Sequence, residues 1–179
     1  MENVSTGHYQ ETVETVERLA KVSFAGHVLT SDPAWPGLWR CRNPGTTFYS
    51  FNILFPPGAV VLYGDVGEII LRPNDYDSLG WLTRCINSRD YILSKIRPGT
   101  KTYYLGDGKA ELEKAMEGKI HVGVSFDIYT MEQFHNSWYE VTDSDMPEIS
   151  GHSAANLWNY EALGTFCRLY GEIQSEGKE

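Results

Sequence analysis

Hydrophobic and polar residues alternate most regularly between Thr47 and Phe55. Tyr49, Phe51, Ile53 and Phe55 fall on one side of this segment, and polar residues fill most of the positions between them. A period of two is typical of a strand with one face buried. The pattern therefore predicts a strand over 47–55 with its hydrophobic side toward the core.

Two further strands are predicted directly after this segment. The run 59–63 is apolar throughout, which is typical of a strand covered on both faces. Residues 68–72 carry Ile69 and Leu71 on one side. The connections at 56–58 and 64–67 are short and rich in glycine and proline, and turns this short join antiparallel neighbours. We therefore expect an antiparallel β-meander over about residues 47–72.

Apolar residues at helical spacing occur on both sides of the meander. The segment 9–22 has one apolar stripe, and Glu17 precedes Lys21 by four residues as a favourable pair on its exposed side. Ser88 and Ser153 are the expected N-caps of two later helices. The later helices are predicted over 77–87, 89–96, 109–117, 127–141 and 153–171, and short strands over 102–105 and 120–126.

The order of strands and helices indicates an α+β fold, an antiparallel meander packed against several helices. A length of 179 residues predicts a single domain over 1–179. The segments 31–37 and 142–151 are expected to be loops, and the charged end 172–179 to fray. No apolar run approaches the roughly 18 residues of a membrane span, and no apolar signal region opens the chain, so we expect neither a membrane span nor a secretory signal.

Negative charge is concentrated in the C-terminal part of the sequence. The chain has 15 Lys+Arg against 24 Asp+Glu, and residues 101–179 hold 6 basic and 14 acidic residues. Such a surface repels nucleic acid, whose phosphates need a basic footprint, and it attracts basic protein surfaces. Two interpretations stay open: a solvated acidic face, and a face that competes for a nucleic-acid-binding groove.

The cysteines and histidines lack the spacings of known catalytic or metal sites. Cys41, Cys85 and Cys167 are far apart, and no C-x-x-C occurs, which excludes zinc ribbons and thioredoxin-type motifs. They are expected to be buried free thiols in a reducing cytosol. The five histidines lack H-E-x-x-H spacing, and there is no P-loop, G-x-S-x-G or G-x-G-x-x-G. We therefore expect no cofactor.

Asp65 and Glu68 flank the turn at 64–67 and are the candidates for a metal site. Two carboxylates there could bind a hard cation. No other acidic residue follows at a recognised spacing, and Gly-Asp-x-Gly is also ordinary turn chemistry. A metal site and a structural turn are therefore the two alternatives, and the turn is favoured.

Trp35 lies in the Pro/Gly-rich loop 31–37. An exposed loop tryptophan is a typical interface anchor, whereas a tryptophan folded back would close the sheet as a lid. Both interpretations stay open.

One local stretch is basic and lies close to tyrosines, an arrangement that can bind single-stranded nucleic acid. It consists of Arg84, Arg89, Lys95, Arg97 and Lys101. On helices these charges are expected to spread and to pair with carboxylates such as Asp90. Direct nucleic-acid binding is therefore not favoured.

A series of short motifs runs through residues 39–97. It consists of W-R-C-R-N-P-G-T at 39–46, Y-S-F at 49–51, P-G at 57–58, Y-G-D at 63–65, W-L at 81–82 and Y-I-L-S-K at 91–95. In this series the chain resembles a group of small uncharacterised proteins encoded by bacteriophages, prophages and mobile plasmids. The resemblance implies an accessory protein in the cytoplasm of a bacterial host, and it carries no catalytic residues over. Small acidic proteins of this kind are often inhibitors of host defence, including those similar to anti-CRISPR proteins.

The leading hypothesis is a non-enzymatic, phage-type protein that binds and inhibits a host defence protein or ribonucleoprotein with a basic groove. The acidic face would be formed by Glu140, Asp143, Asp145 and Glu148, and Trp35 would anchor the contact. Two alternatives remain. One is a small metal-dependent hydrolase or nuclease that uses Asp65 and Glu68, and the other is a homo-oligomeric scaffold whose aromatic residues bury one another.

Overall fold

The computed structural model describes residues 7–97, 101–103, 112 and 150–177. The chain divides into two compact units. The small unit comprises residues 1–14 and 101–152, and the sheet unit comprises residues 15–100 and 153–179. The expectation of a single domain stays a prediction.

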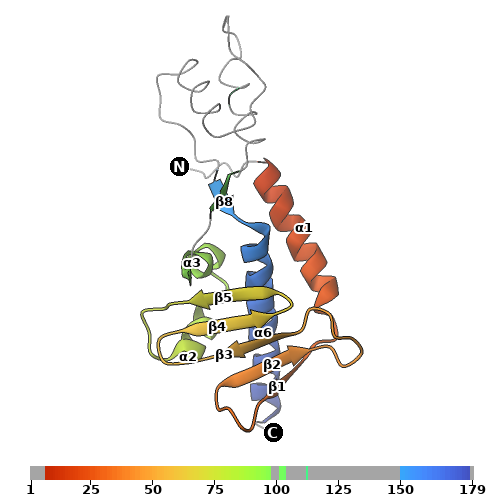
Figure 1. Cartoon of the computed structure of the whole chain (residues 1–179), viewed down its shortest axis with the longest axis vertical. Coiled ribbons are helices and arrows are strands. Elements are labelled where there is room, and N and C mark those ends of the chain that lie inside the picture. The colour runs from red at the N-terminus through yellow and green to blue at the C-terminus, as the bar shows by residue number, and fades with distance from the viewer. Residues whose placement is uncertain (1–6, 98–100, 104–111, 113–149, 178–179) are drawn as a thin grey trace, which may run out of the picture. The chain divides into compact units, whose positions relative to one another are not determined.

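Six antiparallel strands form one sheet in the sheet unit. They are β1 (Val28–Ser31), β2 (Leu38–Arg42), β3 (Phe51–Leu54), β4 (Val60–Gly64), β5 (Gly67–Leu71) and β6 (Ile96–Arg97). Their order in the sheet is their order in the chain, so the sheet is a meander (Figure 1). The α+β fold with an antiparallel meander is thereby confirmed, and β1, β2 and β6 extend the sheet beyond the three predicted strands.

The alternation over 47–55 forms a strand only in its second half. β3 begins at Phe51, and Tyr49 before it has a φ of +59°. A residue in this left-handed conformation turns the chain and cannot continue the pleat. The Nε2 atom of buried His27 lies 3.2 Å from the Tyr49 carbonyl oxygen and hydrogen-bonds to it, which ties this turn to the end of α1. The predicted start at Thr47 is therefore wrong.

The apolar run over 59–63 is buried on one side only. Val60 and Leu62 in β4 are fully buried, whereas Tyr63 is 37% exposed. In register beside β4, Leu71 and Ile69 of β5 continue the buried side. The expectation of a strand covered on both faces is thus wrong, because the described helices lie against only one face of the sheet.

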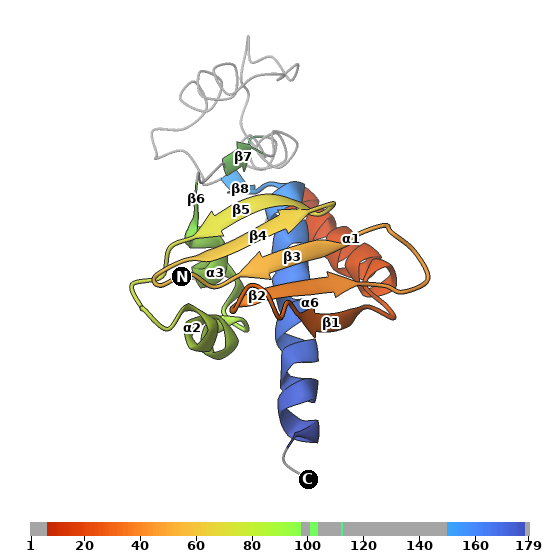
Figure 2. The same ribbon diagram turned by 60° about the horizontal axis from the view of Figure 1, so that its bottom comes forward.

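The helices of the sheet unit gather on that one face. They are residues 15–23 of α1 (Gly7–Ser23), α2 (Ser78–Cys85), α3 (Arg89–Ser94) and α6 (Ala154–Glu176). α6 crosses the strands, with α1 on one side of it and α2 and α3 on the other (Figures 1 and 2). No described helix of the sheet unit covers the opposite face of the sheet.

Aromatic side chains join α6 to the sheet. The Phe166 ring lies 6.2 Å from the Trp39 ring of β2 and 5.2 Å from Phe55. Nearer the start of α6, the Trp158 ring lies 5.3 Å from Phe24 and 5.4 Å from Tyr49. Phe166 thus fixes α6 on the sheet, and Trp158 ties the start of α6 to the residue after α1 and to the turn before β3.

The two ends of α6 differ in how well the sequence predicts them. The Ser153 hydroxyl accepts a 3.2 Å hydrogen bond from the Asn156 amide, as expected of an N-cap. The helix continues past Gly171 to Glu176, so its predicted end at 171 is wrong. Arg168 and Glu172 form an i,i+4 pair at 2.8 Å across the predicted end, which supports the added turns.

In the small unit, β7 (Lys101–Tyr103) pairs antiparallel with β8 (Ser150–His152). β7 matches the strand expected over 102–105, whereas β8 lies where the sequence predicts the end of a loop. The elements predicted over 109–117, 120–126 and 127–141 lie outside the described residues, Leu112 apart. Over the described part of the chain, no helix has the length and apolar character needed to cross a membrane.

Candidate functional site

Trp35 is exposed at the tip of the turn between β1 and β2. Its side chain is 67% exposed, so it does not fold back as a lid on the sheet. Pro33 and Pro36 lie on either side of it, and each proline fixes its own φ and restricts the residue before it. The indole is therefore presented to solvent from a backbone with few accessible conformations.

Asp32 closes this turn. Its carboxylate accepts a 2.9 Å hydrogen bond from the Ala34 amide and pairs with the Arg40 guanidinium on β2. Backbone hydrogen bonds link the Asp32 amide to the Leu38 carbonyl at 2.9 Å and the Leu38 amide to the Trp35 carbonyl at 3.0 Å. The hydrogen bonds from Arg40 and Ala34 lower the pKa of Asp32 below its usual value. The turn is thus held in one shape at neutral pH.

The predicted acidic face cannot be placed. Glu140, Asp143, Asp145 and Glu148 lie outside the described residues. Their part in binding stays a prediction based on the charge of residues 101–179.

Asp65 lies in the tight turn between β4 and β5, and Glu68 lies in β5, in register with Tyr63 of β4. The Asp65 carboxylate accepts a 3.2 Å hydrogen bond from the Ser50 amide, and the Asp65 amide donates to the Ser50 carbonyl at 2.9 Å. Gly64 and Gly67 take φ values of +140° and +110°. No group of three or more His, Cys, Asp or Glu side chains suited to a metal ion occurs among the described residues. The geometry of Asp65 is that of a structural turn.

The cysteines are free thiols in the fold. Burial raises the pKa of Cys41 and of Cys167 to about 12. Both are therefore almost entirely protonated at neutral pH, and a protonated thiol is a poor nucleophile. Cys41 is fully buried, as expected, whereas Cys85 and Cys167 are partly exposed.

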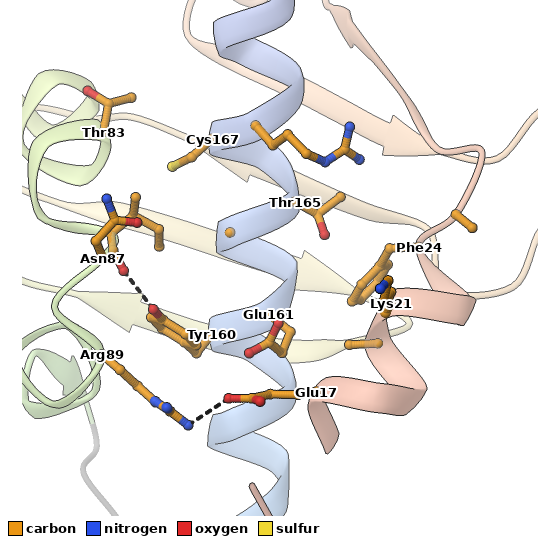
Figure 3. Close-up of a pocket in the computed structure, with 15 residues that line it drawn as sticks. Glu17, Lys21, Phe24, Thr83, Asn87, Arg89, Tyr160, Glu161, Thr165 and Cys167 are labelled. Atoms are coloured by element: carbon orange, nitrogen blue, oxygen red, sulfur yellow. Dashed lines mark hydrogen bonds and ion pairs between the residues drawn. The ribbon is translucent and has the colours of Figure 1, made fainter. Parts of the chain in front are cut away.

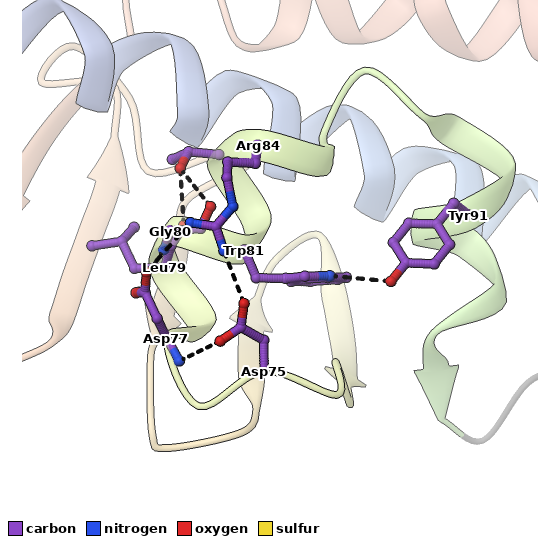
Figure 4. A network of polar contacts seen from close by, with 8 residues as sticks. Asp75, Asp77, Leu79, Gly80, Trp81, Arg84 and Tyr91 are labelled. Carbon is purple, nitrogen blue, oxygen red and sulfur yellow. Dashed lines mark hydrogen bonds and ion pairs between the residues drawn. The ribbon is translucent and has the colours of Figure 1, made fainter.

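Four residues of the basic stretch, Arg84, Arg89, Lys95 and Arg97, lie in the sheet unit, and each of them is engaged there. Arg84 bonds Asp75 at 2.8 Å and approaches Asp77 at 3.5 Å, beside the Trp81 indole that donates to Tyr91 (Figure 4). Arg89 pairs with Glu17, the Lys95 ammonium lies 4.8 Å from the centre of the Tyr91 ring, and Arg97 donates to two backbone carbonyls. Arg84 and Arg89 thus pair with carboxylates, but these are Asp75, Asp77 and Glu17, and the expected pairing with Asp90 and the acidic C-terminal half is not found among the described residues. Residues engaged in this way form a poor footprint for phosphates.

A pocket of about 800 Å³ opens on the side of α6 that faces away from the sheet (Figure 3). α1 forms one wall, and the α2–α3 connection forms the other. Phe24 and Ile86 contribute apolar surface to these two walls, and Gly164 lies on α6 between them. A volume of this size falls in the range of small-molecule sites, roughly 300–1,000 Å³.

The polar groups of the pocket meet near the middle of α6. The Glu17 carboxylate on α1 pairs with Arg89 on α3 at 3.0 Å. The Tyr160 hydroxyl donates a 2.7 Å hydrogen bond to the Ile86 carbonyl. Half-buried Glu161 has a raised pKa, chiefly because burial disfavours its charge and further because Glu17 is close, while Arg89 acts in the opposite direction. Burial and the nearby Glu161 also raise the pKa of Tyr160.

The sequence analysis assigns no role to Glu161 or to this pocket. The one local sequence signal of the pocket is Gly164, a glycine inside the helix that the sequence predicts over 153–171. Glycine costs about 1 kcal/mol relative to alanine inside a helix, so its use there suggests a need for space. The other walls come from segments far apart in the sequence, and nothing local indicates that they meet.

No protein-family model, curated protein or solved structure matches this chain.

Proposed function

We propose that this chain is a non-enzymatic binding protein of the bacteriophage accessory type, which inhibits a host defence protein or ribonucleoprotein. The observation that carries the proposal is the exposed Trp35 side chain on a turn fixed by Asp32. Tryptophan is among the residues that contribute most to protein–protein binding. A fixed turn also lowers the entropy that is lost when a partner immobilises the side chain.

The acidic residues would guide the partner to this anchor. Residues 101–179 carry 6 basic and 14 acidic residues, and this field attracts a basic surface such as a nucleic-acid-binding groove. We assign the contact to Glu140, Asp143, Asp145 and Glu148, as the sequence indicates. Occupation of such a groove would exclude its nucleic acid without any chemical step.

The other candidate chemistries have less support in the described residues. Asp65 is engaged in a turn, and the thiols of Cys41 and Cys167 are protonated at neutral pH. The arginines of the basic stretch are paired with carboxylates or backbone carbonyls. These observations favour a binding protein over a hydrolase or a nucleic-acid-binding module.

A lysate pulldown with matched variants tests the proposal. The bait is the full chain, the Trp35→Ala variant, or the Tyr76→Ala variant, whose tyrosine is 87% exposed in the same unit. We expect a captured protein or ribonucleoprotein whose affinity falls at least tenfold with Trp35→Ala and is unchanged with Tyr76→Ala. A second arm asks whether expression of the chain in a CRISPR-protected bacterium restores plating of a targeted phage, and whether Trp35→Ala abolishes that effect.

The dependence of binding on salt concentration measures the electrostatic part of the contact. Binding should weaken steeply as salt rises, and reversal of charge at the four acidic residues should slow association. Equal capture by Trp35→Ala would overturn the role of Trp35. Tolerance of both about 0.5 M salt and the charge reversal would overturn the electrostatic mechanism. If only the chain itself is captured, light scattering will identify the homo-oligomeric scaffold instead.

A further inference from the structure

The Glu161 carboxyl is the unusual group in the pocket over α6. It is half-buried, and within the described residues no hydrogen bond or ion pair reaches it. Carboxylates removed from water are normally paired or hydrogen-bonded, because desolvation of an unpaired charge is costly. Glu161 therefore has an unmet need for a positive partner.

No lysine or arginine in the described part of the chain forms an ion pair with Glu161. Arg89 is close enough to influence Glu161, but its guanidinium bonds the Glu17 carboxylate. Lys21 on α1 and Arg168 on α6 also line the pocket, and Arg168 pairs with Glu172. The acidic pair of Glu17 and Glu161 thus shares a single nearby guanidinium, which leaves room for a second cation (Figure 3).

Gly164 provides the space that such a partner would fill. It lies one helical turn after Glu161, and a Cβ atom built on it would meet nothing within 4 Å. Ile86 in the neighbouring wall is apolar and partly exposed, whereas Ala20 and Phe24 are buried. A carboxyl beside an open floor with an apolar wall suits a ligand with one charged end and an apolar body.

We propose that this pocket binds an organic cation, whose ammonium or guanidinium group pairs with Glu161 while its apolar body lies over Gly164 and against Ile86. The cation is either a free amine or a Lys or Arg side chain of a bound protein. This site is separate from the Trp35 turn, so the inference does not depend on the proposed function.

The test uses the purified full chain and three probes. Two probes are the cations phenethylammonium and butylguanidinium. The third probe, 2-phenylethanol, is the uncharged counterpart of phenethylammonium. Amide NMR shifts and calorimetry follow each titration up to about 10 mM, which is tenfold above the millimolar Kd of a weak fragment. We expect both methods to detect at least one cation, with shifts around 160–168, and no response to 2-phenylethanol.

Two variants assign the site and one serves as a control. Glu161→Gln should weaken cation binding at least tenfold. Gly164→Leu should abolish it while the melting temperature stays the same or rises, because leucine favours a helix and has free space there. Glu68→Gln removes an exposed acidic residue far from the pocket and should leave the affinity unchanged.

Three results would overturn the inference. It fails if neither cation binds, if 2-phenylethanol binds equally well, or if Glu161→Gln retains the affinity. Once binding is established, the pulldown identifies the source of the cation. Loss of the captured partner with Gly164→Leu indicates a partner's side chain, and retention indicates a free amine.

Discussion

Glu17 on α1 forms its ion pair with Arg89 on α3, at 3.0 Å, although Lys21 lies one turn further along α1. The sequence predicts the pair within the helix. In the fold, the α2–α3 connection brings a guanidinium to the same carboxylate, and a planar guanidinium suits carboxylate geometry better than a flexible ammonium does. The pair links the two walls of the pocket over α6.

Replacement of Arg89 by methionine should destabilise the protein modestly. The Arg89 and Glu17 side chains are 36% and 47% exposed, so solvent screens the pair, and we expect a loss of about 0.5–1 kcal/mol in the free energy of unfolding. Urea unfolding at low salt measures it. Arg168→Met, which removes a more exposed pair, should cost less. A loss that is identical in high salt would contradict an electrostatic origin.

Glu161→Gln should stabilise the protein at neutral pH and not in acid. The pKa of Glu161 is raised in the folded state, chiefly by burial, so the folded chain holds this proton more tightly than the unfolded chain. Stability from this group is complete below the unfolded value and is lost as pH rises through the folded value. Thermal unfolding at pH 4 and pH 7 should show an increase in melting temperature only at pH 7. Glu68→Gln is the exposed control, and an equal effect from it would refute this account.

Gly64→Ala should be strongly destabilising. Its φ is +140°, and an added Cβ would lie 2.6 Å from the Ser50 carbonyl oxygen and 2.8 Å from the Phe51 Cα. Backbone atoms cannot move aside cheaply, so we expect a loss of about 2 kcal/mol or more. Gly58→Ala is the matched control, because its φ is +70° but nothing lies within 4 Å. It should cost only about 1–2 kcal/mol of left-handed strain. Equal losses would mean that the close approach is unimportant.

Divalent metals should leave the melting temperature unchanged. Asp65 already accepts a hydrogen bond from Ser50, and no cluster of three metal-binding side chains occurs among the described residues. A ligand that binds only the folded state would raise the melting temperature. Thermal unfolding with magnesium, manganese and calcium checks this. A shift that disappears in Asp65→Asn would restore the metal-dependent alternative.

The sequence predicts those strands whose alternation of apolar and polar residues lies within a few neighbouring positions. Phe51 and Ile53, or Ile69 and Leu71, alternate over short distances, and glycine and proline mark the turns between them. β2 is not among the predicted strands, although Trp39 and Cys41 alternate with two arginines. β6 is only two residues long and exists because β5 lies beside it, so no local pattern could predict it.

The candidate functional residues also divide into those with a local sequence signal and those without one. A tryptophan between two prolines is a local feature, and its exposure at position 35 agrees with one of the two predicted alternatives. The pocket is not local, because Glu17, Arg89 and Glu161 are separated by more than seventy residues at each step. Gly164 on the floor of the pocket is a local feature of the sequence, but the sequence does not show which segments form the walls around it.

The sequence by itself determined the meander, the apolar stripes of the helices, the Ser153 cap of α6 and the turn chemistry around Asp65, since these depend on backbone preferences and on periods of two or 3.6 residues. Ser88 begins α3 as expected, but its side chain makes no capping hydrogen bond. Only the tertiary structure decided that Arg89 pairs with Glu17, that β4 is buried on one side, and that Glu161 lines a pocket with no ion pair to any described residue. Those outcomes depend on which segments pack together, and packing brings residues within a few ångströms of each other whatever their separation in the chain.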